Sequence, residues 1–292
     1  MKSTQTTKLH SIFFTRQIAL FLLVCFGFSW SVAAVIWQTG GLHSSLAFLL
    51  LVVYMFGPAI AAITCACLFD RKRWKQALGF TSWPKWIWFG GLVLAIMIVI
   101  GSTLISLLGL DVHWIGFKQG LQQVFEAENV DIEALPLSLD QLVWLQILIN
   151  IPVGIAINSF LLLNEELGWR GWLFDRWRPL GFWRGNLMIG FVWGLWHAPV
   201  IAMGFNYPEL PIAGIFLMIG FTLLISPIIG WLREAGRSVF AASIFHGTIN
   251  ALAGVGLMVI NLPDMPWRGM VGIGGFVMLA TVCLMLLVLR RD

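Results

Sequence analysis

The sequence has little charge, because only 11% of its 292 residues are Asp, Glu, Lys or Arg, where soluble domains have about 25%. Hydrophobic residues make up 59% of the chain. This balance excludes an ordinary soluble globular protein, a disordered chain and a coiled coil. Low-complexity segments and clear internal repeats are also lacking. The composition is typical of a polytopic membrane protein.

Cysteine is scarce as well. The four cysteines are Cys25, Cys65, Cys67 and Cys283, and all lie in apolar runs. Cys65 and Cys67 are two residues apart, so on a helix they face different directions. We therefore predict free, buried thiols, and neither disulfides nor cysteine metal ligands.

Eight apolar stretches are long enough to be candidate transmembrane helices across a hydrocarbon core of about 30 Å. They are residues 17–37, 46–69, 86–110, 142–163, 187–204, 211–232, 239–261 and 269–289. A signal peptide is the alternative interpretation of the first, but its apolar run exceeds the usual core of about 7–15 residues. We expect an all-α transmembrane bundle in which residues 1–292 form one membrane domain.

Lysine and arginine predict the orientation of these spans. With a cytoplasmic N-terminus, sixteen of the eighteen basic residues fall on the cytoplasmic side, and only Lys118 and Arg268 fall outside. This distribution follows the positive-inside rule and predicts that both termini are cytoplasmic. It also accounts for the net charge of +4, so we expect no nucleic-acid partner.

The long outer segment, residues 111–141, is acidic. Its large apolar residues recur at helix-like spacing: Trp114, Phe117, Leu121 and Val124. We predict an amphipathic helix on the outer membrane surface. Ser138 and Gln141 have the spacing of a capping box that opens the fourth span.

Two adjacent carboxylates, Glu165 and Glu166, follow the fourth apolar run directly. Pro152 predicts a break or kink near residues 150–152, since proline lacks an amide donor. A helix restarting there would carry both carboxylates inside the bilayer, with Glu165 about 16 Å from the inner surface. Glu166 and Arg170 are four residues apart and can pair on one helix face. A simple ion pair that caps the inner helix end is the alternative, but it leaves Glu165 unexplained.

Two further spans each contain a histidine. His197 lies beside a stripe of small residues, Gly190, Gly194 and Ala198, which permits close approach of a neighbouring helix. Each histidine taken alone is also compatible with a simple hydrogen bond between helices.

The second histidine, His246, shares a helix face with Asn250. Ala242 and Gly254 extend that face with small residues. Together with Glu165 and His197, His246 lies at an expected depth of roughly 14–20 Å from the basic rim, so the three side chains could converge. Two imidazoles and one carboxylate form the ligand set of a catalytic zinc site, so a divalent metal, zinc, is the expected cofactor, with a glutamate-activated water that needs no metal as the alternative. An HExxH motif is lacking, so separate helices would have to assemble the site.

These motifs resemble those of the CPBP family of intramembrane proteases, which includes type II CAAX prenyl endopeptidases and Abi-like proteins. That family is marked by EExxxR, FxxxH and HxxxN on separate transmembrane helices. Glu165-Glu166 with Arg170 is similar to the first motif, and His246 with Asn250 is similar to the third. The second departs, because Trp193 stands where the family has Phe; we interpret this position as an aromatic packing element. The resemblance covers roughly residues 142–255, the expected catalytic core.

The resemblance implies that Glu165 activates the attacking water. It implies that His197, His246 and Asn250 complete the site, either as metal ligands or as stabilisers of the oxyanion. The tentative metal ligands are Glu165, His197 and His246. Glu166 and Arg170 would form a supporting pair.

The expected function is thus an intramembrane endopeptidase that cleaves a membrane-associated peptide of the prenylated or leader type. An inactive membrane scaffold of the same fold is one alternative, and a proton-coupled transporter is another. The partners are the lipid bilayer and the substrate. We expect a prokaryotic plasma membrane, with the site opening to the cytoplasm.

Overall fold

The structure is a computed structural model that describes residues 15–82, 86–261 and 265–290. Within these residues the chain is almost entirely helical, and the only β contact is an isolated bridge between Trp114 and Ile260. The all-α prediction is confirmed. Of the basic residues that predicted the orientation, Lys2, Lys8, Lys85 and Arg291 lie outside the described residues.

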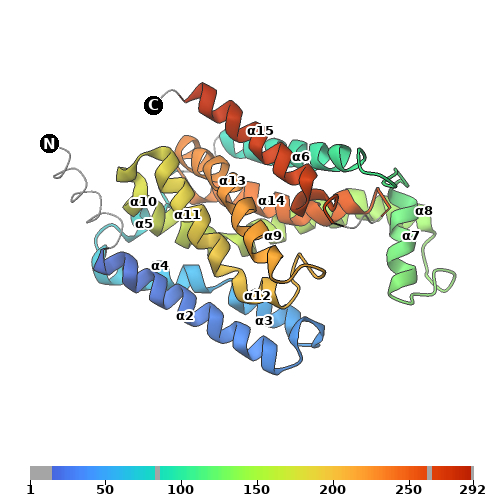
Figure 1. Ribbon diagram of the computed structural model, residues 1–292, viewed down its shortest axis with the longest axis horizontal. Coiled ribbons are helices and arrows are strands. Elements are labelled where there is room, and N and C mark those ends of the chain that lie inside the picture. The colour runs from blue at the N-terminus through green and yellow to red at the C-terminus, as the bar shows by residue number, and fades with distance from the viewer. Residues whose placement is uncertain (1–14, 83–85, 262–264, 291–292) are drawn as a thin grey trace.

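The helices follow one another in this order along the chain (Figure 1). The first half contains α2 (Arg16–Gln38), η1 (Gly41–His43), α3 (Ala47–Tyr54), α4 (Gly57–Phe69), α5 (Trp74–Ala77), α6 (Trp86–Ser106), α7 (Phe117–Ala127), α8 (Leu139–Leu145) and η2 (Gln146–Asn150). The second half contains α9 (Ile151–Glu166), η3 (Leu167–Leu173), α10 (Phe174–Trp177), η4 (Arg178–Leu180), α11 (Phe182–Trp196), α12 (Ala198–Ala202), α13 (Ala213–Gly236), α14 (Val239–Leu257), η5 (Gly269–Val271) and α15 (Ile273–Leu289).

Each of the eight predicted spans coincides with helix. In the part of the chain that the structure describes, six continuous helical stretches are long and apolar enough to cross a bilayer. The fifth predicted span corresponds to the shorter α11 and α12, and the eighth corresponds to the 17 residues of α15. These apolar helices define an integral, multi-pass membrane protein, whereas the number of eight crossings and the cytoplasmic termini stay predictions.

The helices form a bundle with the long helices running roughly lengthwise. Figure 1 shows α2 along one side and α6 with α15 along the other, with α9, α11, α13 and α14 between them. The most extensive helix contacts join α11 to α13 and α14 to α9. These two pairs position the candidate site, because Glu165 and Glu166 lie on α9, His197 directly follows α11, and His246 lies on α14.

The fourth span is not interrupted at Pro152, so the predicted break does not occur, whereas the alternative of a kink stays a prediction. The chain stays helical from Leu139 to Leu180. Pro152 lies in the first turn of α9, directly after the π-helical η2. A π turn widens the helix and changes its hydrogen-bond pattern, so the turn before the proline can absorb the missing donor without interrupting the helix.

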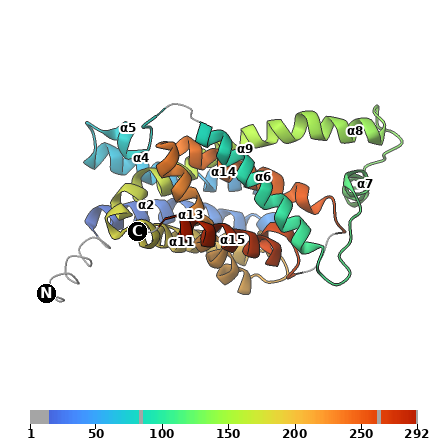
Figure 2. The ribbon, with the colours of Figure 1, turned by 90° about the horizontal axis from the view of Figure 1, so that it is seen from above.

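The outer segment contains the predicted amphipathic helix, which is α7. It begins at Phe117, so Trp114 lies before it. The predicted capping box is confirmed, since Gln141 N donates to Ser138 Oγ at 3.3 Å and Ser138 N donates to Gln141 Oε1 at 2.9 Å. Figure 2 shows α7 and α8 together at one end of the molecule.

All four cysteines are free, as predicted. Cys25 and Cys65 are buried and Cys283 is partly buried, but Cys67 is exposed on the surface of the bundle. The prediction of burial is therefore wrong for Cys67. Its position on α4 faces away from Cys65, and away from the core.

Glycines bring the helix pairs together. A Cβ atom at Gly190 would lie 2.6 Å from the Thr222 carbonyl oxygen, and one at Gly194 would lie 2.6 Å from Ile219 Cα. On α14 the close contact is at Gly247, where a Cβ would lie 2.4 Å from Ser159 Cα. A Cβ atom at Gly254 would meet nothing within 4 Å. The close approach to a neighbouring helix on α14 is therefore at Gly247, next to His246, and not at Gly254.

We expect Gly190→Ala to destabilise the bundle by about 1–3 kcal/mol, because the added methyl overpacks the contact between α11 and α13. Gly154→Ala is the matched control, since a Cβ at Gly154 meets nothing within 4 Å. Thermal unfolding in detergent measures both variants. Equal melting temperatures for the two variants would contradict the close approach of these helices.

Candidate active site

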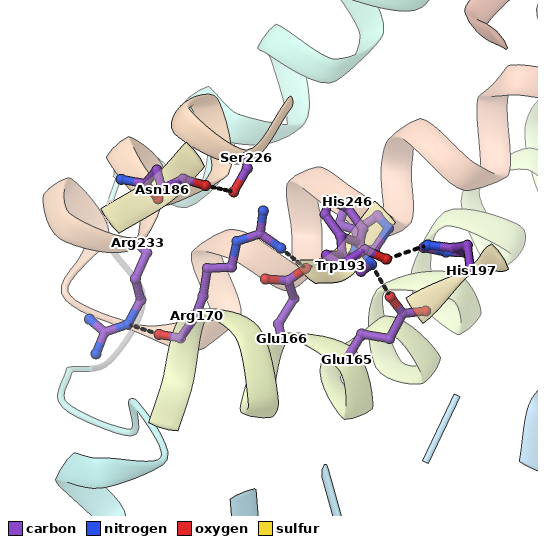
Figure 3. Close-up of polar contacts among 9 residues, drawn as sticks. All are labelled: Glu165, Glu166, Arg170, Asn186, Trp193, His197, Ser226, Arg233 and His246. Carbon is purple, nitrogen blue, oxygen red and sulfur yellow. Dashed lines mark hydrogen bonds and ion pairs between the residues drawn. The ribbon is translucent and has the colours of Figure 1, made fainter. Parts of the chain in front are cut away.

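Glu165 and Glu166 occupy the last turn of α9, where the helix passes into the π-helical η3. Both are buried, with 4% and 0% of their surface exposed. Being consecutive on a helix, their side chains diverge: Figure 3 shows Glu166 turned toward Arg170 and Glu165 turned toward Trp193 and His197. The two carboxylates therefore have different partners.

Glu166 is the acceptor of a buried ionic network. Arg170 Nη1 donates to Glu166 Oε1 at 3.2 Å, which confirms the predicted pair. His246 Nδ1 lies 2.8 Å from the same oxygen. Arg170 is completely buried and also lies over the Trp193 ring, with 4.6 Å between its Cζ and the ring centroid. A carboxylate with two such donors keeps its charge compensated in a low-dielectric interior.

Glu165 has a neutral partner. Trp193 Nε1 donates a hydrogen bond of 2.9 Å to Glu165 Oε2. The interpretation of Trp193 as a packing element is therefore incomplete, because its indole also serves as a polar group. Sequence reasoning missed this role. The available signal was the departure from Phe, since among Phe, Tyr and Trp only the indole carries an N–H donor.

His197 lies where α11 ends. Its Nδ1 is 2.9 Å from the carbonyl oxygen of Trp193. A carbonyl can only accept, so we assign the hydrogen to Nδ1, and the Nε2 of a neutral ring then carries a lone pair. The same holds for His246 when its Nδ1 donates to the Glu166 carboxylate. Both imidazoles thus keep Nε2 for other chemistry.

A cavity of about 370 Å³ brings these groups together. Glu165, His197, His246 and Asn250 all line it. Glu166 and Arg170 do not, and they lie behind Glu165 and His246. Asn250 is exposed one turn beyond His246 on α14. The remaining wall is mainly apolar and includes Tyr54, Trp196 and Phe221, which sequence reasoning did not identify.

The cavity extends away from the arginine-rich end of the bundle. Its lining comes from α3, the second half of α9, the end of α11, the first half of α13, the middle and second half of α14, and the connections near Phe205 and Val271. Arg184 and Arg233 lie at the opposite ends of the two lining helices α11 and α13. Cytoplasmic termini and a cytoplasmic opening of the site both stay predictions.

The donor chemistry of the cavity suits a divalent metal in part. Each histidine has its Nδ1 held by a carbonyl or a carboxylate, which is how metal-ligating histidines are commonly oriented. However, no group of three or more His, Cys, Asp or Glu side chains in the described residues is placed to hold a metal ion. The residues therefore do not form a complete ligand group as they stand, and the zinc site stays a prediction.

The fold and site together define a helical membrane protein with a buried, carboxylate- and histidine-lined cavity. Within this class, residues 141–252 match the family model described as type II CAAX prenyl endopeptidase Rce1-like. The chain is also 30% identical over 163 residues to CAAX prenyl protease 2 of Methanococcus maripaludis. That alignment covers 46% of this chain and 60% of the relative. The resemblance inferred from the three motifs is confirmed, and the matched region contains all six candidate site residues.

We expect Arg170→Met to destabilise the protein by about 3–5 kcal/mol, because Glu166 would lose its buried cationic partner. Lys118→Ala is the control, since Lys118 pairs with Asp140 at 2.6 Å on the exposed surface, where such a pair contributes about 1 kcal/mol or less. Chemical unfolding in detergent measures the difference. Comparable losses in the two variants would show that the buried network does not stabilise the fold.

Proposed function

We propose that this chain is an intramembrane endopeptidase. The observation that carries the proposal is the placement of Glu165, His197 and His246, from three separate helices, on the wall of one cavity. The match to the Rce1-like family model over the region that contains these residues supports it. The activity itself, its substrates and its partners are part of the proposal.

Glu165 is the proposed general base. One of its oxygens, Oε2, is held by Trp193, and this leaves Oε1 for a water molecule in the cavity. Glu165 takes a proton from the water while the oxygen of the water forms a bond to the scissile carbonyl carbon. The protonated Glu165 then donates to the peptide nitrogen as the carbon–nitrogen bond breaks. Proton transfer of this kind commonly accelerates a reaction by about 100-fold or more.

The other polar groups stabilise the charge that develops on the carbonyl oxygen. Asn250 can donate an amide N–H from the cavity wall, an effect that is commonly large in acyl transfer. His246 is oriented by Glu166, and it can donate from Nε2 when its ring is protonated. His197 has its lone pair at Nε2 in the neutral ring, so it can accept a hydrogen bond from the water.

Glu166 and Arg170 act behind the cavity wall. Their buried pair fixes the position of His246 without occupying the cavity. Because Arg170 compensates Glu166, the adjacent Glu165 can gain and lose a proton while its neighbour stays charged. This arrangement separates the proposed catalytic carboxylate from the supporting one.

The proposed substrate is a membrane-associated peptide of the prenylated or leader type. The cavity wall is largely apolar, which suits a substrate that arrives from the lipid bilayer. The relative from Methanococcus maripaludis is called a CAAX prenyl protease. A prokaryotic plasma membrane is the proposed location, and nucleic acid has no part in the activity.

We expect Glu165→Gln to lower the rate of peptide cleavage by at least about 100-fold, because the amide cannot accept the water's proton. The assay uses purified protein and membrane-anchored peptides with and without a prenyl group. Glu126→Gln on the exposed α7 is the matched control and is expected to retain full activity.

Two other outcomes would contradict the protease. Absence of cleavage by the unmodified protein on every peptide would favour a scaffold. Proton-coupled uptake into liposomes that depends on Glu165 would favour a transporter.

A divalent metal, zinc, remains the proposed cofactor, and its ligands would be Glu165, His197 and His246 as the alternative to the hydrogen-bonding roles of these side chains described above. Bound in the cavity, it would supply Lewis-acid polarisation of the scissile carbonyl. We expect 1,10-phenanthroline to abolish cleavage, added zinc to restore it, and His246→Ala to lose bound zinc as measured by elemental analysis. Cleavage that persists after complete removal of metal would overturn the cofactor and leave the Glu165 chemistry intact.

A further inference from the structure

Trp193 contacts four of the five charged or titratable members of the candidate site, which are Glu165, Arg170, His197 and His246. Its indole N–H donates to Glu165, and its carbonyl oxygen is bonded to His197. Its ring face lies against Arg170. The ring also meets His246 edge-to-face, with 5.0 Å between the centroids. Apart from Trp193, these side chains come from three different parts of the fold.

The indole of Trp193 is itself firmly held. It is 2% exposed, and Gly194, the next residue on α11, lets that helix pack directly on α13. A buried donor in a fixed position can hold an acceptor with little freedom. By contrast, Glu165 has no cationic neighbour at ion-pair distance among the described residues.

Two other buried indoles show that this hydrogen bond is particular to Trp193. The Nε1 atoms of Trp169 and Trp196 are buried and have no hydrogen-bond partner among the described residues. Trp169 packs between Phe21 and Trp196 and does not line the cavity. A buried indole in this bundle can therefore be packed without a hydrogen-bond acceptor for its N–H group, so packing alone does not explain the bond between Trp193 and Glu165.

We propose that Trp193 is a positioning residue that anchors Glu165 Oε2 through its indole N–H and so presents Oε1 to the cavity. This inference rests on the proposed function for its catalytic consequence, but the anchoring itself is independent of any activity. A phenylalanine at this position would preserve an aromatic ring and lose the anchor. The chain thus uses the departure from the FxxxH pattern to fix its catalytic carboxylate.

The first test measures the carboxyl group without any substrate. Dicyclohexylcarbodiimide is an apolar reagent that couples to buried carboxyl groups, and peptide mass spectrometry locates the adduct. In Trp193→Phe we expect Glu165 to be labelled about tenfold faster, as for the loss of a hydrogen bond to a charged group. Trp169→Phe is the matched control, because it removes the same ring atoms but no hydrogen bond, and its labelling is expected to be unchanged.

A second variant separates the N–H from the shape of the ring. Site-specific replacement of Trp193 by 3-benzothienylalanine keeps the bicyclic ring and substitutes sulfur for N–H. We expect the same faster labelling as in Trp193→Phe, with a melting temperature no lower than that of Trp169→Phe. Unchanged labelling of Glu165 in the benzothienyl protein would overturn the proposal.

The peptide assay supplies the functional measurement. In both Trp193 variants we expect kcat to fall about tenfold with KM unchanged, because a displaced base affects the chemical step and leaves binding intact. A rise in KM with constant kcat would overturn the positioning role. If the unmodified protein cleaves no peptide but the labelling changes as expected, the anchor is supported and the endopeptidase is not.

Discussion

The burial of charge at the end of α9 is the constraint on which the site depends. Glu166 and Arg170 are completely buried, and removing ions from water costs several kcal/mol for each. Polar contacts within the network offset this cost, because Glu166 Oε1 lies within hydrogen-bond distance of both Arg170 Nη1 and His246 Nδ1. Among the described residues, the hydrogen-bond donor to the adjacent Glu165 is a neutral indole. Two chemically identical side chains thereby acquire different surroundings, one in an ionic network and one beside a neutral donor at the cavity wall.

The π-helical η3, which follows the two glutamates, is itself fixed by contacts with three neighbouring segments. Wider turns leave backbone groups outside the usual helical pattern, and the Arg170 carbonyl oxygen accepts a hydrogen bond of 2.8 Å from Arg233 Nε. A Cβ at Gly168 would lie 2.5 Å from Pro58, and one at Gly171 would lie 2.7 Å from the Leu78 carbonyl oxygen. The backbones of α4 and of the segment after α5 therefore press directly against η3. The helix that carries both glutamates is fixed by α13 and by these two segments, so small displacements of the carboxylates are resisted.

The sequence was sufficient to predict features that depend on local spacing. A residue pair four apart on a helix must share a face, which is why Glu166 and Arg170 were paired correctly. The capping box of Ser138 and Gln141 is similarly local. The partner of His246 is a different matter, because it depends on how α14 is rotated against α9. Gly247 sets that rotation by packing on Ser159. The spacing of residues within α9 or within α14 does not indicate which residue of α9 His246 will contact.

The sealed and open sides of the cluster give the site its direction. Arg170 and Arg233 lie on one side of the two glutamates and His197 lies on the other (Figure 3). His197, Asn250 and the apolar wall line the cavity, whereas Arg170 and Arg233 do not. Under the proposed function, water and the scissile carbonyl would reach Glu165 from this cavity and not from the side of the ion pair, because Glu165 lines the cavity and Glu166 and Arg170 do not. The base, the two imidazoles and the Asn250 amide would then act on one carbonyl from the wall of a single cavity.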